Sequence, residues 1–157
     1  MKKITYKFDY QEFENTSEVS KENLTLINKA KEIAYKAYAP FSKFRVGATV
    51  LLKNGTIYSG NNQENASFPA GICAERALLS YIHGNFPDEQ ILKIAISVLD
   101  ANQPISPCGI CRQSLLEYEL VQNQTIEIIL HNASDSVLVI PSASSLLPIQ
   151  FDSKMLP

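Results

Sequence analysis

Residues 91–100 read ILKIAISVLD and decide how the rest of this chain is arranged. Six apolar or small residues follow one another at positions 94–99, a run typical of a strand covered on both faces. A segment with helical spacing of apolar residues lies on each side, GICAERALL at 71–79 and SPCGICRQSLLEYE at 106–119. The stretch therefore predicts a sheet with helices on both faces.

Two elements are predicted before this core. Residues 21–38 have apolar side chains at helical spacing, with Ser20 as the N-cap and Pro40 stopping the pattern. Residues 44–62, FRVGATVLLKNGTIYSGNN, contain two β-rich runs joined by Asn54 and Gly55, the pair favoured where both turn residues need positive φ. A helix and a hairpin are expected.

Gly84 is expected to end the first cysteine-bearing helix, and TIEIILHN and SVLVIP supply two strands after the second. Residues 3–13 alternate enough for an edge strand or an irregular arm. The fold class predicted is α/β, a three-layer sandwich with a mixed five-stranded sheet and helices on both faces. We expect one domain over residues 1–157, with residues 1–20 as an N-terminal arm.

Composition narrows the function classes. The 157 residues are 45% hydrophobic and 19% charged, with a net charge of −2, as in an ordinary globular protein, and nothing in the charge calls for nucleic acid. No signal peptide and no membrane span are seen, so a cytoplasmic location is expected. Three cysteines are an odd number, which in a reducing compartment favours metal binding or redox chemistry over disulfides.

All three cysteines lie at the two helix starts. Cys73 stands alone, whereas Cys108 and Cys111 form a C-x-x-C pair. Separately, a lone cysteine is usually a small core residue, and C-x-x-C before a helix could equally be a redox pair. Together, they can converge on one Zn²⁺ with Zn–S distances of ~2.3 Å.

Three thiolates would leave the metal with a net charge of about −1, so something must offset them. The helix N-termini supply part of that offset. Arg76 and Arg112 follow the thiols closely and could donate hydrogen bonds to sulfur. The alternative for each is a solvated arginine on the surface, and this alternative is favoured more for Arg112 than for Arg76.

The site could be open and catalytic or closed and structural. His83 cannot complete a Cys₃His site, because ten helical residues separate it from Cys73 by ~15 Å. His131 is not excluded by this distance, but a histidine that binds no metal is the simpler interpretation. Glu75 is what a hydrolytic zinc needs, a general base that is not a ligand. Acidic residues also favour the first turn of any helix, but beside three thiols Glu75 favours catalysis.

These residues resemble a known family. CAER at 73–76 and PCGICRQ at 107–113 resemble the signature of the cytidine deaminases. SKFRVGATV from Ser42, NNQENASF and LLPIQF from Leu146 are similar to further segments of its small homotetrameric members. The resemblance covers about residues 34–151.

The resemblance implies roles for individual residues. It implies that Cys73, Cys108 and Cys111 bind zinc, with Glu75 as the proton shuttle and Arg76 donating hydrogen bonds to the thiolates. The residues that it implies for substrate binding are Phe44 at the pyrimidine ring, Asn62 and Glu64 at the ribose 3′-hydroxyl, Ala74, and Phe151, which would reach a neighbouring subunit's site.

The activity implied is zinc-dependent hydrolytic deamination of cytidine and 2′-deoxycytidine in pyrimidine salvage, by a homotetramer that needs neither nucleic acid nor a membrane. Gln63 and FPAGI at 68–72 depart from the common pattern on the expected substrate side, so another aminated nucleoside or base is one alternative. A polynucleotide deaminase should show a basic groove, for which 14 Lys and Arg against 16 Asp and Glu give little sign. A zinc-stabilised interaction module without catalysis is the last alternative.

Overall fold

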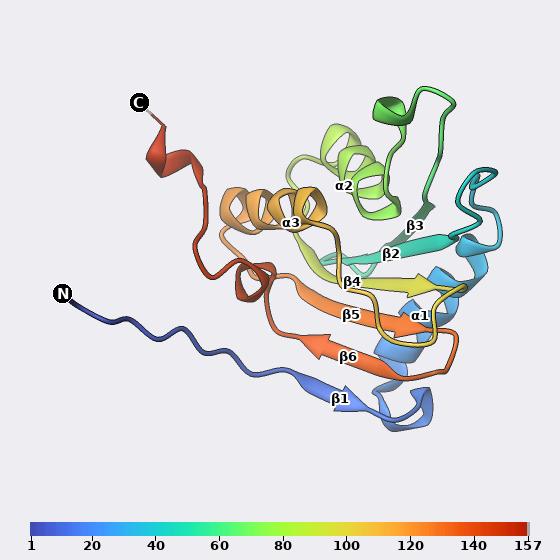
Figure 1. Cartoon of the computed structure of the whole chain (residues 1–157), viewed down its shortest axis with the longest axis horizontal. Coiled ribbons are helices and arrows are strands. Elements are labelled where there is room, and N and C mark those ends of the chain that lie inside the picture. The colour runs from blue at the N-terminus through green and yellow to red at the C-terminus, as the bar shows by residue number, and fades with distance from the viewer. Residues whose placement is uncertain (157) are drawn as a thin grey trace.

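A computed structural model, which describes residues 1–156, places six strands in one mixed sheet in the order β1-β6-β5-β4-β2-β3 (Figure 1). The strands are β1 (Gln11–Phe13), β2 (Val46–Leu52), β3 (Ile57–Asn61), β4 (Ile91–Val98), β5 (Glu127–Asn132) and β6 (Val137–Ile140). The helices are α1 (Lys21–Ala34), α2 (Ala74–Asn85) and α3 (Gly109–Gln122), with 3₁₀ turns that include η1 (Thr16–Glu18) and η3 (Ala143–Leu146).

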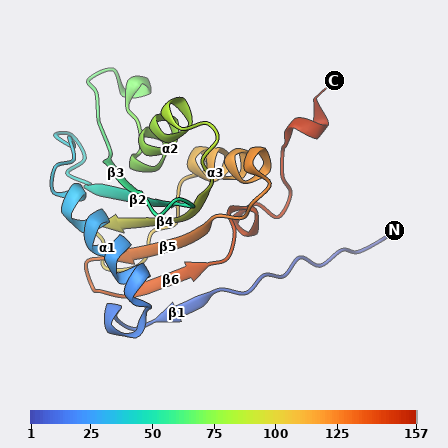
Figure 2. The same ribbon diagram turned by 180° about the vertical axis from the view of Figure 1, so that it is seen from behind.

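Alternate residues of the strands pack on opposite helical layers, which confirms the predicted three-layer arrangement. Leu51 and Ala95 belong to the apolar cluster formed with α1, whereas Val50 and Ile94 belong to the cluster formed with α2 and α3. Figures 1 and 2, which view the molecule from opposite sides, show α1 across one face of the sheet. A strand that is apolar at consecutive positions is therefore buried on both sides.

The sheet has six strands rather than the five predicted. The additional strand is β1, which lies within the segment expected to be an arm and pairs antiparallel with β6 at the sheet edge, Gln11 opposite Val139. An edge strand was one of the two alternatives expected for residues 3–13, and the last three of these residues, QEF, form it. Residues before β1 continue as an extended arm.

The strand β4 is central, as its sequence predicts. It pairs antiparallel with β2 and parallel with β5, with Ile94 opposite Ile128 in the parallel register. The parallel connection runs through α3, which covers the same face as α2. The cysteine-bearing starts of both helices are thereby brought together.

The first helix begins as predicted and ends earlier. The Ser20 side chain accepts a hydrogen bond from the Asn23 amide at 3.1 Å, whereas the helix stops at Ala34 instead of Tyr38. The Tyr38 backbone instead donates to the Asn62 carbonyl at 3.1 Å and accepts from the Glu64 amide at 2.8 Å. This segment is therefore held against the site rather than continuing the helix.

The hairpin is confirmed, with one difference in its turn. Leu51 pairs with Ile57, and of the two central turn residues only Gly55 has a positive φ, 84°. The longer loop, closed by a hydrogen bond from the Gly55 amide to the Leu52 carbonyl, needs one left-handed residue rather than two. Gly84 does not end α2, because the helix continues to Asn85.

Candidate functional site

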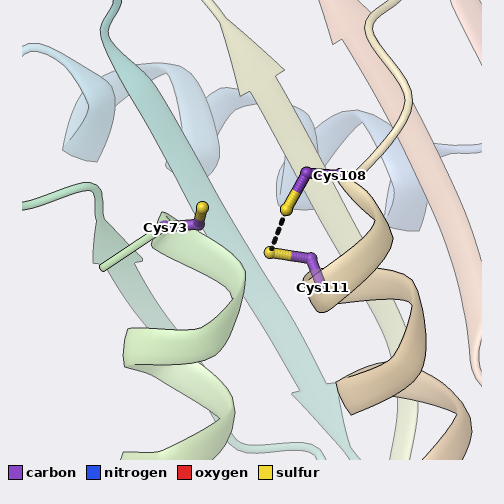
Figure 3. Close-up of side chains that lie close together, drawn as sticks. All are labelled: Cys73, Cys108 and Cys111. Atoms are coloured by element: carbon purple, nitrogen blue, oxygen red, sulfur yellow. Dashed lines mark hydrogen bonds between the residues drawn. The ribbon is translucent and has the colours of Figure 1, made fainter. Parts of the chain in front are cut away.

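The three cysteines meet where α2 and α3 begin (Figure 3). Cys73 and Cys108 are the N-caps of the two helices, and Cys111 lies in the first turn of α3. Neither N-cap side chain makes a capping hydrogen bond, so both thiols are free to face each other. All three sulfur atoms lie within 4.8 Å of one another, and those of Cys108 and Cys111 are 3.5 Å apart.

This spacing fits one tetrahedral zinc ion. Zn–S bonds of ~2.3 Å at tetrahedral angles place sulfur atoms ~3.8 Å apart, close to the arrangement found here. The C-x-x-C pair and Cys73 together would occupy three corners of the tetrahedron. The fourth corner is left for water or substrate. Among the described residues, the metal-competent cluster that contains these cysteines includes no histidine or carboxylate.

The electrostatics of the thiols also favour a bound cation. Hydrogen bonding with Cys111, with smaller contributions from Cys108 and Arg76, lowers the pKa of Cys73 to about 5 against the opposing effect of burial. The same hydrogen bond raises the pKa of Cys111, as do burial and the nearby Glu75 carboxylate. One thiolate is thus stabilised at the expense of its neighbour, and all three can ionise together only if a cation neutralises them.

Arg76 lies beside the same sulfur atoms. Burial tends to lower the pKa of its guanidinium, but hydrogen bonding and charge from Cys73, with a smaller contribution from Cys111, raise it overall. Its Nε is buried and, within residues 1–156, has no hydrogen-bond partner. The buried Arg76 Nε–H can therefore donate to a thiolate, because no neutral acceptor competes for it.

Glu75 is a buried carboxylate next to the cysteine cluster. It occupies the first turn of α2 and is only 5% exposed. Burial raises its pKa, and the charge of Cys73 raises it further. Because it lies beside the cluster without belonging to it, this group can accept and return a proton there.

A pocket of about 180 Å³ opens beside the cluster and joins most of the predicted site. Its lining includes Phe44, Asn62, Ala74 and Glu75, together with the first two cysteines of the chain. The remaining walls were not predicted from the sequence; they are Val46, Ile96, Val98, Ile105, Ser106 and Pro107. The strand residues could have been recognised as the positions where β2 and β4 approach the cysteine helices, but the loop residues carry no periodic signal.

Asn62 links the hairpin to the segment that carries Phe44. Its Oδ1 accepts a hydrogen bond from the Val46 amide, and its Nδ2 donates to the Phe44 carbonyl, both at 2.8 Å. An amide side chain that satisfies a backbone donor and a backbone acceptor at once fixes the local chain direction. The aromatic ring of Phe44 is therefore held at the pocket wall.

Two predicted substrate contacts lie outside this pocket lining. The Glu64 carboxylate accepts hydrogen bonds from the Phe41 amide at 2.8 Å and from the Ser42 hydroxyl, and these bonds, that of Ser42 first, lower its pKa. Phe151 is 57% exposed, and its carbonyl accepts a hydrogen bond from Gln113 at 2.9 Å. The lining of the same chain's pocket is thus formed without either residue.

The remaining sequence-predicted groups have other environments. His131 is bonded through Nδ1 to Ser97 and through Nε2 to Asp135, so it does not join the cysteines. Arg112 donates to the Pro107 and Leu146 carbonyls instead of lying free on the surface.

The segment that departs from the family pattern does not line the pocket. Gln63 donates to the Asn61 side chain, and neither it nor residues 68–72 belong to the pocket lining, which differs from their predicted place on the substrate side.

Within residues 1–156, none of the helices combines the length and apolar character needed to cross a bilayer.

Comparisons with known proteins agree with this geometry. The model of the cytidine and deoxycytidylate deaminase zinc-binding region matches residues 20–126. A cytidine deaminase of Halalkalibacterium halodurans is 42% identical over 94 residues, which cover 59% of this chain and 68% of that protein. Cytidine deaminase 3 of Arabidopsis thaliana is 34% identical over 149 residues, 93% of this chain and 66% of that protein. The crystal structure of a cytidine deaminase from Burkholderia pseudomallei superimposes with a TM-score of 0.73 at 38% identity, covering 85% of this chain and 100% of that one.

Proposed function

Because this chain belongs to the cytidine and deoxycytidylate deaminase family, we propose that it hydrolyses cytidine and 2′-deoxycytidine to uridine and 2′-deoxyuridine, with release of ammonia. One observation carries the proposal: Glu75 is a buried carboxylate beside three converging cysteines, at the wall of a pocket. A structural zinc site has no use for such a group, whereas hydrolysis requires a base that is not a ligand. The reaction belongs to pyrimidine salvage.

The residues that hold the metal are Cys73, Cys108 and Cys111, whose sulfur spacing and charge fit Zn²⁺. When bound, Zn²⁺ supplies a Lewis acid that lowers the pKa of water from 15.7 toward ~7. Arg76 and the two helix N-termini offset the negative charge of the thiolates. Without that offset, three thiolates would weaken the Lewis acid.

Glu75 carries the protons of the reaction. It accepts one proton from the attacking water, whose oxygen bonds to C4 of the pyrimidine, and delivers a proton to N3. It then accepts the second proton, from the hydroxyl now bonded to C4, and delivers it to the departing amino group, so that the C4–N bond breaks, the C4 carbonyl forms and ammonia leaves with no net change in the carboxylate. Burial of Glu75 keeps bulk water from exchanging with that proton during the transfer.

The nucleoside is recognised by the base and the ribose separately. Phe44 packs against the pyrimidine ring, and Ala74 contacts it from the start of α2. Asn62 and Glu64 bind the ribose 3′-hydroxyl; in support, the Asn62 amide uses only one of its two N–H donors on the Phe44 carbonyl. A free 3′-hydroxyl belongs to a nucleoside rather than to a nucleotide inside a strand.

We also propose that residues 1–157 act as one domain of a homotetramer. Every strand described between residues 1 and 156 joins one sheet, which supports a single domain. Phe151, exposed and outside its own chain's pocket, completes the site of a neighbouring subunit. Light scattering at working concentration should give four times the monomer mass; a mass near that of one chain would contradict the assembly.

The test of the activity follows the ultraviolet absorbance of cytidine and 2′-deoxycytidine with zinc-loaded protein, beside a sample treated with a chelator. Loss of the cytosine band that depends on zinc is expected for both. A labelled single-stranded DNA is tested in parallel at low salt, where tight binding would support a polynucleotide substrate instead. Intact zinc with no loss of either nucleoside would refute the proposed function.

A further inference from the structure

The N-terminal arm, residues 1–10, is an extended segment that leaves the sheet at β1 and runs away from the body of the molecule (Figures 1 and 2). The match to the zinc-binding region begins at residue 20, so the arm lies outside the matched region. Within residues 1–156, the backbone of residues 1–9 makes no backbone–backbone hydrogen bond. An extended segment with unsatisfied backbone groups is prepared to pair with another strand.

The arm has one apolar face. Ile4, Tyr6, Phe8 and Tyr10 alternate with polar residues and are 80%, 46%, 41% and 52% exposed. The ring centroids of Tyr6 and Phe8 lie 6.2 Å apart and those of Phe8 and Tyr10 lie 6.1 Å apart, so the rings form a continuous row. The Tyr6 hydroxyl donates a hydrogen bond to the Ser144 carbonyl, which links the arm to the body. The pattern is that of a half-buried strand whose covering surface is missing.

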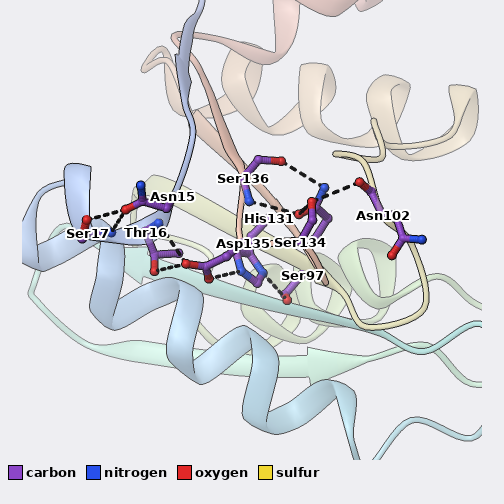
Figure 4. Close-up of polar contacts among 10 residues, drawn as sticks. Asn15, Thr16, Ser17, Ser97, Asn102, His131, Ser134, Asp135 and Ser136 are labelled. Carbon is purple, nitrogen blue, oxygen red and sulfur yellow. Dashed lines mark hydrogen bonds and ion pairs between the residues drawn. The ribbon is translucent and has the colours of Figure 1, made fainter.

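The root of the arm is held firmly (Figure 4). The Asp135 carboxylate accepts hydrogen bonds from the Thr16 amide and hydroxyl, at 3.2 and 2.8 Å, and lies 3.2 Å from Nε2 of the buried His131. His131 is bonded in turn to Ser97 on β4 at 2.8 Å. Together with the β1 ladder, this network fixes the direction in which the arm leaves the sheet.

The outer edge of β1 is also open, because β1 is the terminal strand of the sheet. Gln11 and Glu12 are exposed, as is Glu14, which follows the strand. The arm and β1 therefore form one continuous edge from residue 2 to residue 14. Nothing within residues 1–156 pairs with this outer edge.

Charge along this edge is self-complementary. The first part is basic, with Lys2, Lys3 and Lys7, and the second part is acidic, with Asp9, Glu12 and Glu14. An antiparallel pairing of two identical edges about a two-fold axis places the basic part of one opposite the acidic part of the other.

We propose that the arm and β1 pair, antiparallel and about a two-fold axis, with the same segment of a second copy of this chain. The two sheets then join into one across the axis. This interface is independent of the deamination chemistry.

The side chains favour one register over the adjacent ones. A two-fold axis through Phe8 places Lys7 opposite Asp9, Tyr6 opposite Tyr10 and Lys2 opposite Glu14. Moving the axis to residue 7 or to residue 9 would place lysine opposite lysine or aspartate opposite aspartate, and an axis between residues would set the apolar face of one arm against the polar face of the other.

A cross-linking experiment tests the register on the zinc-loaded full chain, whose native thiols are then ligated. In Phe8→Cys the two new thiols face each other across the axis, with Cα atoms about 4.5–5.5 Å apart, within the range of a disulfide. In the control Thr5→Cys they are ~20 Å apart, because each lies opposite residue 11 of the other copy. Mild oxidation should give covalent dimers of the first variant only. Equal cross-linking of both variants, or none of the first, would overturn the register.

A charge exchange tests the pairing without changing the apolar face. Lys7→Glu and Asp9→Lys each place like charges opposite one another twice per dimer, so each should weaken this association about tenfold or more. The double variant restores both pairs and should recover it. Sedimentation across a concentration series should show that the single variants already dissociate at protein concentrations where the wild type remains associated. Single variants that match the wild type, or a double variant that stays dissociated, would overturn the proposal.

Discussion

Replacement of Asn62 tests how the pocket wall is held. The side chain satisfies the Val46 amide and the Phe44 carbonyl at 2.8 Å each, in a half-buried position. Asn62→Ala leaves both backbone groups without that partner. An ordinary hydrogen bond contributes ~0.5–1.5 kcal/mol, and an unsatisfied group costs ~1–3 kcal/mol. Because water reaches this position in part, we expect a loss of ~2–3 kcal/mol in the free energy of unfolding.

Asn62→Asp separates the two bonds by pH. At neutral pH the carboxylate still accepts from the Val46 amide, but its second oxygen faces the Phe44 carbonyl and repels it. The folded state therefore raises the pKa of the new carboxyl above its usual ~3.9. The destabilisation is present above that raised pKa and is relieved as the pH falls and the protonated oxygen donates to the carbonyl.

Urea unfolding of zinc-loaded protein measures these changes, with KM for cytidine measured on the same samples. The control Asn54→Ala removes a hydrogen bond to the Thr56 amide in the exposed hairpin turn and should cost at most ~0.5 kcal/mol. KM should rise for both Asn62 variants and not for the control. An Asn62→Ala protein within ~0.5 kcal/mol of the wild type would refute the role assigned to these two bonds.

Three further predictions follow from particular residues. His131→Ala should keep one zinc per chain by metal analysis, and loss of the metal would favour a closed Cys₃His site. Gly47→Ala should destabilise the protein by ~2 kcal/mol or more, because the new Cβ would lie 2.0 Å from the Ala30 carbonyl oxygen. Gly84→Ala should instead stabilise α2 by ~0.5–1 kcal/mol, because nothing lies within 4 Å of its Cβ. Urea midpoints that do not separate the two variants would contradict this. Asp135→Asn should lower stability at pH 7 and approach the wild type below pH ~4. Burial raises the pKa of the Asp135 carboxyl, but hydrogen bonds from Thr16 and the contact with His131 lower it overall, so its contribution to stability disappears as the pH falls and it is protonated. A difference that does not depend on pH would contradict this.

The central part of the fold was predictable because its elements carry local signals. Residues 94–99 are apolar or small without interruption, which predicts a strand with helices on both sides, and Ser20 has the chemistry of an N-cap. The ends of elements depend instead on partners distant in sequence. Tyr38 leaves the helical pattern because Asn62 and Glu64 bind its backbone, and β1 becomes a strand because β6 offers an edge.

The cysteine cluster was predictable for a geometric reason. Cysteines at the starts of two helices can converge on one site, and all three cysteines of the chain lie at such starts. The wall formed by Ile105, Ser106 and Pro107 belongs to an irregular loop, whose course follows from tertiary packing rather than from periodicity. The bonds of Asn62 to Phe44 and Val46 were hidden for the same reason, since hydrogen-bond partners 16 and 18 residues away leave no local pattern.

The rate of cytidine deamination by Glu75→Gln, measured beside the wild type at equal zinc content, tests the central claim most directly. Glutamine keeps the size of the side chain but cannot carry the proton, so kcat should fall by ~10²–10⁴-fold or more while one zinc per chain is retained. Turnover close to that of the wild type, with zinc still bound, would contradict the role of Glu75 as the proton carrier of a zinc-dependent deaminase.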